Sequence, residues 1–468
     1  MIRFLILILV GHLCYGNETN DEKNQISDFL NALRDAKYVS YSKKDFAEFL
    51  VQCHKEGVPE DFKKGFGSNL NGANFNQLYL SKSVFDGVSL IGADFSNTDL
   101  SDVSFIDVDL RGANFSNANL HGIKIKGTNL SFTKFVSANL TDIVFDQSNV
   151  SYADFISSDL KKVSMHNVIG LHTNFSNVKM NFSNLSNSNV SHVNFSDSEI
   201  NDTVMQKNNL DNASFFGVDA YKLKIQFSSL KNANIYGAEL KESDFTGSNL
   251  SDACLNSSII INSNFDETDL SNTQISYVND DNSSFVQSIL NGSKIKHAYV
   301  SEANLHDADL SNIDFSFSEL HQVNVSNADI RHGKFHNTKV ANSNMNGSFF
   351  DHSLFTYVKI EDSDLSTTSM YKIKIQDSQV YNSTLSRHNI DSSEIENSTF
   401  FNLLADNSSW SNLKVTNSNF IESDFRSSLL HANAFRKTSF FLSNLSNSTI
   451  SDMSFHSSSI YKSSVADV

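Results

Sequence analysis

From Leu70 to Val465, hydrophobic side chains recur at every fifth position of the chain. Every residue whose number is a multiple of five belongs to this series, and 76 of its 80 members are Leu, Phe, Ile, Val, Met or Trp. Hydrophobic residues make up only 39% of the chain, yet 24 of the 38 Phe stand in this one series. The frame never slips, so the series defines one continuous repeat region.

A second restricted series lies two positions before the first. It includes Ala73, Ala93 and Ala113 and continues mostly as Ser, Thr, Val or Ala, whereas the other three positions of each repeat are usually polar. A period of five matches neither the 3.6 residues of an α-helix nor the two residues of a β-strand, so neither element keeps these sites on one face. The pattern therefore predicts a fold built from five-residue units.

These units resemble the pentapeptide-repeat family, whose loose pattern is a small residue, Asp or Asn, Leu or Phe, and two variable residues. Residues 113–117, 118–122 and 303–307 carry that pattern closely, and the resemblance covers about 400 of the 468 residues. It implies an all-β fold, a right-handed quadrilateral β-helix in which each unit forms one side and four units form a coil. We expect about 20 coils, which at a strand spacing of about 4.8 Å would extend for roughly 95 Å.

A coil of 20 residues should stack like side chains on one another, and the sequence has this property. One column contains Phe in eight successive coils, and a neighbouring column is mainly Leu. Burial of these side chains is the expected source of stability, each worth about 1.5–3 kcal/mol. The predicted core includes Leu70, Phe75, Phe95, Leu110, Phe115, Phe135, Phe155, Phe175, Phe195, Phe215, Leu250, Leu270, Leu310 and Phe335.

The segment from residue 17 to residue 65 has a different pattern. Hydrophobic residues at helical spacing predict two short amphipathic helices, Ser42 with Asp45 fits a capping box, and Gly57 with Pro59 marks the second stop. Repeat arrays need capping ends, so we expect a helical cap on the first coil; the alternative is a partner-binding helical pair. The two hydrophobic sets are Ile26, Phe29, Leu30 and Leu33, and Phe46, Phe49, Leu50 and Cys53.

No comparable segment follows Val465. We therefore expect the last coil to fray, to be closed by a partner, or to pair with another copy as a homodimer.

Residues 1–16 are typical of a secretory signal. Arg3 is followed by an apolar run from Phe4 to Val10 and by the small residue Gly16. That run is too short to span a bilayer, and the alternative interpretation is a hydrophobic N-terminal strand. The expected organisation is a signal peptide at 1–16, a helical cap at 17–65 and a repeat region at 66–468, in a secreted or periplasmic protein.

The remaining chemistry of the sequence offers little for catalysis. After signal removal only Cys53 and Cys254 remain, which excludes a disulfide framework and a cysteine-rich zinc site. No metal, phosphate or catalytic-triad motif is present, and a convex solenoid lacks the concave pocket that catalysis needs. We expect no catalytic residues, no cofactor and no metal; the best metal candidates are the one-coil pairs His172 with His192 and His332 with His352.

Four members of the hydrophobic series break the rule. An unpaired buried carboxylate is costly, so we expect Asp280 to turn outward beside Asp281, with Val278 or Tyr277 filling its place. This acidic kink is either a bulge in the ladder or a local binding feature such as a calcium contact, and Gly170 suggests a bend. The four residues are Gly170, Ala220, Asp280 and Ala405.

Two surface properties bear on partners. The 23 Asn-x-Ser/Thr sequons arise mostly from the repeat itself and are weak indicators of glycosylation. The net charge of -17 is relevant because some pentapeptide-repeat proteins resemble duplex DNA and bind bacterial DNA gyrase in its place. B-DNA carries about one charge per 1.7 Å, more than about fifty over roughly 95 Å. The net negative charge of this chain is therefore small compared with that of a DNA duplex of the same length.

These observations lead to an exported, non-catalytic structural or interaction protein. We expect its Ser-, Asn- and Asp-rich faces to bind a protein or glycan, with no nucleic acid partner and no membrane span. The alternative is a cytosolic DNA mimic acting on a type II topoisomerase, which requires that residues 1–16 do not direct export. An ice-binding array ranks last, because Ser and Asn rather than Thr dominate the faces.

Overall fold

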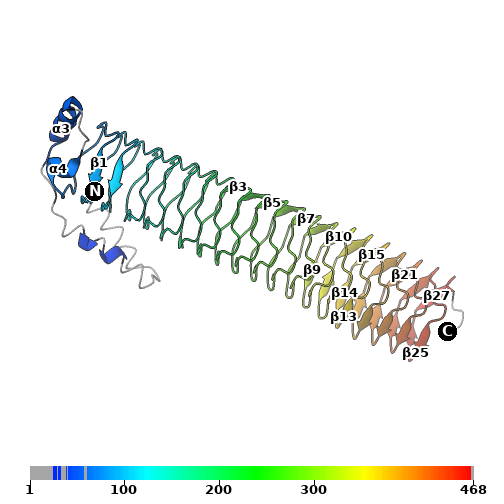
Figure 1. Ribbon diagram of the computed structural model, residues 1–468. Coiled ribbons are helices and arrows are strands. Elements are labelled where there is room, and N and C mark those ends of the chain that lie inside the picture. Colours follow the sequence, from blue (N-terminus) through cyan, green and yellow to red (C-terminus); the bar gives the residue numbers. More distant parts are fainter. Residues whose placement is uncertain (1–24, 29, 33–37, 39–40, 57–60, 465–468) are drawn as a thin grey trace. The chain divides into compact units, whose positions relative to one another are not determined.

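The computed structural model describes residues 25–28, 30–32, 38, 41–56 and 61–464. The predicted signal segment 1–16, Phe29, Leu33, Gly57, Pro59 and Val465 lie outside these ranges. The chain divides into two compact units, unit 1 up to Lys224 and unit 2 from Ile225. In each unit, successive coils follow one another in sequence order (Figure 1).

Each coil contains 20 residues, and neighbouring coils pair in parallel. Asn114 lies opposite Lys134 across one such pair, the amide of Phe115 donates to the carbonyl of Lys134 at 2.6 Å, and the amide of Lys134 donates to the carbonyl of Ala113 at 3.0 Å. Parallel pairing at a fixed offset of 20 residues places every fifth side chain inside. The parallel β-solenoid expected from the sequence is confirmed.

The corners of the coil explain the polar residues of the repeat. The residue two positions after each inward side chain adopts a left-handed conformation, as at Asn97 (φ +55°) and Gly92 (φ +67°). Gly, Asn and Asp tolerate this region better than other residues. The corner therefore favours Gly, Asn and Asp, although Ser, Lys, His and aromatic residues also occupy it.

Unit 1 begins with two helices, α3 (Lys43–Glu56) and α4 (Phe62–Phe66), and the predicted capping box at the start of α3 is confirmed. Phe46 of α3 stacks on Phe75 with ring centroids 4.5 Å apart, and Phe62 of α4 stacks on Phe85 at 4.5 Å. The two helices thus cover the first coil. The strands of unit 1 are β1 (Val84–Asp86), β2 (Ser104–Ile106) and β3 (Asp219–Tyr221), and its other coils pair through single bridges.

Unit 2 contains more three-residue strands, which lie on three sides of its coils (Figure 1). The first side contains β4 (Glu239–Lys241), β5 (Ile259–Ile261), β6 (Asn279–Asp281), β7 (Tyr299–Ser301), β8 (Glu319–His321), β10 (Lys339–Ala341), β12 (Lys359–Glu361), β15 (Gln379–Tyr381), β18 (Thr399–Phe401), β21 (Asn419–Ile421), β24 (Ser439–Phe441) and β27 (Ser459–Tyr461). The second contains β9 (Lys334–His336), β11 (Leu354–Thr356), β14 (Lys374–Gln376), β17 (Glu394–Glu396), β20 (Lys414–Thr416), β23 (Ala434–Arg436) and β26 (Ser454–His456). The third contains β13 (Ser369–Tyr371), β16 (Asn389–Asp391), β19 (Ser409–Ser411), β22 (Leu429–His431) and β25 (Thr449–Ser451).

The core of each unit is one side chain thick. In unit 1 the rings from Phe75 to Phe215 stack coil on coil, with centroids 4.7–5.3 Å apart. All fourteen residues named above as the predicted core are buried, with at most 3% of their surface exposed. The inward side chains therefore occupy the interior of the solenoid, and the other side chains of each unit face outward.

Candidate interaction surface and polar irregularities of the core

The side chains of the Asn and Asp residues that precede inward side chains form hydrogen bonds within the solenoid. The Oδ1 atom of Asn114 accepts from the amide of Ser116 at 3.2 Å and from its hydroxyl at 2.7 Å. The Nδ2 atom of Asn114 donates to Asp94 in the preceding coil at 3.1 Å. These turns and ladders repeat along the chain, so the polar faces form an ordered array rather than a set of independent side chains.

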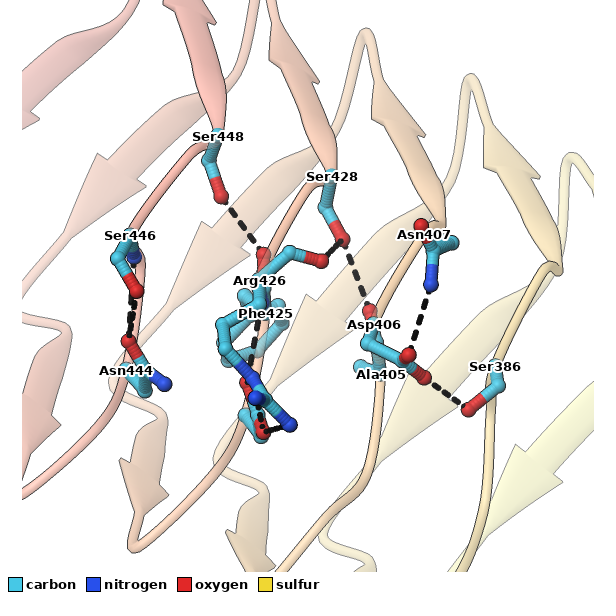
Figure 2. Close-up of polar contacts among 11 residues, drawn as sticks. Ser386, Ala405, Asp406, Asn407, Phe425, Arg426, Ser428, Asn444, Ser446 and Ser448 are labelled. Atoms are coloured by element: carbon cyan, nitrogen blue, oxygen red, sulfur yellow. Dashed lines mark hydrogen bonds and ion pairs between the residues drawn. The ribbon is translucent and has the colours of Figure 1, made fainter. Parts of the chain in front are cut away.

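Several carboxylates are neutralised by a base two residues later. Asp329 pairs with Arg331 at 2.5 Å, and Asp424 with Arg426 at 2.7 Å (Figure 2). The Arg331 guanidinium, by hydrogen bonding, lowers the pKa of the Asp329 carboxyl. These acids are held in local ion pairs, and they do not act as a row of uncompensated charges.

Buried hydroxyls join adjacent coils on the inside. Figure 2 shows Ser428 donating to the carbonyl of Ala405 at 2.9 Å and Ser448 donating to that of Phe425 at 2.7 Å. The Ser428 hydroxyl also accepts from the amide of Ser408 at 3.1 Å. This bridging explains why Ser dominates the small column in unit 2.

Asp280 lies inside the core, so the expectation that it turns outward was wrong. Its exposed fraction is 3%, whereas Asp281 is exposed, and it pairs in register with Ile260 and Val300. Turning Asp280 outward would require a one-residue slip of β6, which would bring Asn279 and Asp281 inward instead. Pairing on both sides of β6 prevents that slip.

The Asp280 carboxyl has an unusual environment. Neither of its oxygens has a hydrogen-bond partner among the described residues, and it borders a cavity of about 30 Å³ that is otherwise lined by apolar side chains such as Val278 and Phe285. Burial raises the pKa of Asp280 to about 7, and the charge of Asp281 acts in the same direction. The Ser283 hydroxyl opposes this effect from nearby but lies outside hydrogen-bonding geometry.

Gly170, where a bend was expected, lies in a ladder that keeps its register. Its amide donates to the carbonyl of Asn189 at 2.8 Å, and Ile169 bridges to Asn189. A Cβ atom at this position would lie 3.0 Å from Val190. Glycine therefore fits a tightly filled position here, where a larger residue would require its neighbours to move.

His388 and Trp410 form a second polar irregularity, which the sequence analysis did not identify. His388 is fully buried, its ring meets Trp410 edge-on at 5.1 Å, and Nδ1 lies 2.7 Å from the hydroxyl of Ser408. Burial lowers the pKa of His388 to about 4. A histidine in the small column was the available signal, because that column otherwise contains mainly Ser, Thr, Ala and Val.

The two histidine pairs are stacked ring on ring. His172 and His192 have centroids 4.5 Å apart, and His332 and His352 4.9 Å. In the described part of the chain, no group of three or more His, Cys, Asp or Glu side chains is arranged to hold a metal ion. Cys53 and Cys254 are not joined in a disulfide. None of the described helices has the length and apolarity needed to cross a membrane.

Aromatic rings also stack at the corners, outside the core. We call Phe132, Tyr152, His172 and His192 the unit 1 ladder, in which Phe132 and Tyr152 are parallel with centroids 4.8 Å apart. Ile26 and Leu30, in the helical residues 25–28 and 30–32, pack on Phe132 and Tyr152. Thus this N-terminal helical segment packs on the side of coils that come well after the first coil in the sequence.

A second corner stack lies in unit 2. We call Tyr277, His297 and Phe317 the unit 2 ladder; the successive centroid distances are 4.9 and 4.8 Å, and the rings are parallel within 3°. Tyr277 is 63% exposed and Phe317 is 43% exposed. Among the described residues, this stack is the exposed counterpart of the covered one in unit 1.

Comparison with known proteins gives a consistent family signal. A family model described as a pentapeptide repeat region matches residues 67–131 and 103–175, and one described as pentapeptide repeats (8 copies) matches residues 225–260 and 298–337. No curated protein matches the chain.

Among solved structures, the chain is similar to HetL, a pentapeptide-repeat protein involved in heterocyst differentiation regulation in the cyanobacterium Nostoc sp. strain PCC 7120. The identity is 15% and the TM-score 0.31, over 56% of this chain and 92% of HetL. Full-length QnrB1, a plasmid-mediated fluoroquinolone resistance protein, gives 18% identity and a TM-score of 0.19 over 53% and 92%. The PL6 family alginate lyase AlyGC gives 8% identity and a TM-score of 0.24 over 89% of this chain and 98% of AlyGC. None of these likenesses assigns a function to this chain.

Proposed function

Because this chain belongs to the pentapeptide-repeat family, we propose that it is an exported, non-catalytic interaction protein. Its outward Ser-, Asn- and Asp-rich faces bind a protein or glycan partner. The observation that carries this proposal is the ordered array of outward amides and hydroxyls over a filled core. Two cavities of about 30 Å³ lie within the core, a size that admits one or two water molecules and no substrate.

The amide ladders determine what kind of group the faces recognise. Asn344 donates to Asn324 at 3.2 Å, and Asn324 donates to Asn304 at 3.0 Å. The Asn324 oxygen also accepts from the amide and hydroxyl of Ser326. Each amide nitrogen carries two N–H groups, so the ladder uses one and leaves a second to point outward. Rows of such donors at the coil spacing suit a partner rich in acceptors, such as glycan oxygens or peptide carbonyls.

Export is the part of the proposal that rests on residues 1–16. The first experiment is N-terminal sequencing and fractionation of the protein from its own cells. A mature start near Asn17 outside the cytoplasm supports export, and an intact Met1 in the cytoplasm contradicts it. Binding of the purified chain to arrays of glycans and extracellular proteins then tests the interaction role, which the absence of any saturable ligand would contradict.

A DNA-mimicking role on a type II topoisomerase is the second candidate, and the net charge of -17 favours it. Local pairing of carboxylates with bases, as in Asp329 with Arg331, weakens the resemblance to a row of phosphates. A gyrase supercoiling assay with the full chain distinguishes the two candidates. Inhibition at stoichiometric concentrations would favour the mimic over the exported binding protein.

A further inference from the structure

We propose that the unit 2 ladder, formed by Tyr277, His297 and Phe317, is a docking site for an acidic amphipathic helix of a partner protein. This inference rests on the proposed interaction function and names one site for it. The observation behind it is the unit 1 ladder, where this chain already seats a helical segment of its own on the same kind of ring stack.

Burial at the unit 1 ladder is caused by that segment. Phe132 is 7% exposed beneath Ile26, which is fully buried. Aromatic residues at the same position of the five-residue unit, but at other corners of the coil, are open, since Phe182 is 63% exposed and Phe227 is 60% exposed. A bare ring at this position of the unit is therefore the ordinary outcome of the repeat, and a covered one marks a bound helix.

The spacing of the helical side chains matches the spacing of the rings. Ile26 and Leu30 are four residues apart, so they lie on one face of a helix with Cβ atoms about 5–6 Å apart. Phe132 and Tyr152 have centroids 4.8 Å apart. One aliphatic side chain can therefore meet each ring, and the 4.9 and 4.8 Å steps of the unit 2 ladder allow the same fit.

The charges beside the two ladders are also alike. In unit 1, Arg111 is paired with Asp109 at 2.5 Å, and the pKa of Arg111, raised first by that hydrogen bond, is raised further by Asp28 of the helical segment. In unit 2, Lys296 adjoins His297 and is paired with Asp314 at 2.8 Å. Arg111 interacts with Asp28 although it is already paired with Asp109. By analogy, Lys296 can interact with an acidic residue near the aliphatic pair of a docked helix while it remains paired with Asp314.

Further rings continue the line of the unit 2 ladder far enough to accommodate a helix of ordinary length. Phe317 meets His336 edge-on at 5.1 Å, and His336 meets Tyr357, which is 56% exposed, at 5.6 Å. Tyr277 and Tyr357 are four coils apart, or about 19 Å, which corresponds to a helix of about 13 residues. Among the described residues, the helical segment that packs on a corner stack is already placed on the unit 1 ladder, so the proposal assigns the unit 2 ladder to a helix of another protein.

The test uses the full chain and a fluorescent synthetic peptide with the sequence of residues 17–33, which contains Ile26, Asp28 and Leu30. Saturable binding is expected by anisotropy, weaker at 0.5 M salt than at about 0.05 M because the charge contact is screened. The double substitution Tyr277→Ser with Phe317→Ser should weaken binding at least tenfold. Serine occupies the same corner position at Ser137 and Ser157, so the variant is expected to fold, and circular dichroism checks this.

Two controls separate the site from general stickiness. Phe182→Ser removes an exposed ring outside both ladders and should leave binding unchanged, and a peptide with Ile26→Ser and Leu30→Ser should not bind. Equal binding by the Tyr277→Ser/Phe317→Ser chain, or no binding by the unaltered chain, overturns the proposal. Self-association that is lost in both the Ile26→Ser and the Tyr277→Ser chains also overturns it, because a second copy would then be the occupant.

The binding arrays distinguish failure of this site from failure of the proposed function. If array ligands bind the unaltered chain and the Tyr277→Ser/Phe317→Ser chain equally well, the interaction function stands and the ladder site is wrong. If the Tyr277→Ser/Phe317→Ser chain loses a helical protein ligand but retains other ligands, both the interaction function and the ladder site are supported.

Discussion

Units 1 and 2 use the same five-residue repeat but differ in what interrupts it. In unit 1 the Phe stack continues from Phe75 to Phe215, and the exceptions in the hydrophobic series, Gly170 and Ala220, are small and buried without a polar side chain. In unit 2 the exceptions include Asp280, and His388 replaces a small residue in the core more than five coils further along the chain. The two 30 Å³ cavities both belong to unit 2.

This difference shows how a solenoid tolerates residues that depart from its repeat. Each coil contacts only its neighbours, so an irregularity has a local cost that the rest of the array does not share. A small residue changes packing alone, whereas a titratable residue also couples the stability of its coils to pH. The coils around Asp280 in unit 2 should therefore respond to pH more strongly than the coils around Gly170 and Ala220 in unit 1, and the following experiments examine that contrast.

The largest expected effect is the loss of a stacked ring in unit 1. Phe135→Ala removes a fully buried side chain from the middle of the Phe stack. It should lower the local free energy of unfolding by about 3–5 kcal/mol, measured by hydrogen exchange of the amides in the adjacent coils. Phe182→Ser, at an exposed corner, serves as the control; a comparable loss in both variants would show that the stack is not the main source of stability.

The second effect is a pH dependence of the coils around Asp280 in unit 2. The pKa of folded Asp280 is raised to about 7 from an ordinary value of 3.8, so the folded state holds its proton more tightly than the unfolded state. The contribution of Asp280 to the free energy of unfolding of these coils should be most favourable below about pH 4 and should fall by roughly 2–4 kcal/mol as the pH rises to about 7. Hydrogen exchange near β5, β6 and β7 measures this, after correction for intrinsic exchange rates; a flat profile would contradict a buried, titrating carboxyl.

A third experiment removes the irregularity itself. Asp280→Val restores an apolar side chain between Ile260 and Val300 and should stabilise the surrounding coils by roughly 1–4 kcal/mol at neutral pH. The gain should shrink at pH 4, where the native carboxyl is neutral. Asp281→Val, on the exposed side of the same strand, is the matched control, and thermal unfolding at both pH values provides the measurement. A gain that does not vary with pH would mean that packing, not charge, limits this coil.

The smallest effect concerns the hydroxyl bridges. Ser428→Ala removes the donor to Ala405 and the acceptor for the amide of Ser408, and should cost about 1–2 kcal/mol because buried polar groups lose their partners. Ser446, whose hydroxyl contacts Asn444 at the surface, provides the control Ser446→Ala, with a change of at most about 0.5 kcal/mol. Chemical denaturation followed by Trp410 fluorescence measures both. Equal losses would argue that the inward bridges have no special role.

Much of this architecture was accessible without coordinates. The unbroken period of five, with like residues stacked every 20 positions, fixed which side chains face inward, because only a four-unit coil aligns them. The orientation of Asp280 was mispredicted for a physical reason. The cost of one buried carboxylate favours an outward orientation, but the register of β6 is set jointly by β5 and β7.

The candidate binding site was less accessible. A corner aromatic such as Phe132 looks in sequence like any other variable position, and its contact with Ile26 joins residues more than a hundred positions apart. Similarly, His388 stood in the small column without attracting notice, and its contact with Trp410 required the coils to be stacked. Such contacts depend on which residues of different coils become neighbours at the surface.

By itself, therefore, the sequence determined the repeat, the inward-facing residues, the coil length and the polar character of the faces, since a strict period imposes the same local geometry on every unit. The tertiary structure decided the orientation of the residues that depart from the repeat and the contacts of the helical segment. It held Asp280 inside, because pairing on both sides leaves a strand no freedom to turn. It also placed Ile26 and Leu30 on one ring stack and left another exposed, because that choice depends on contacts between segments that the period does not relate.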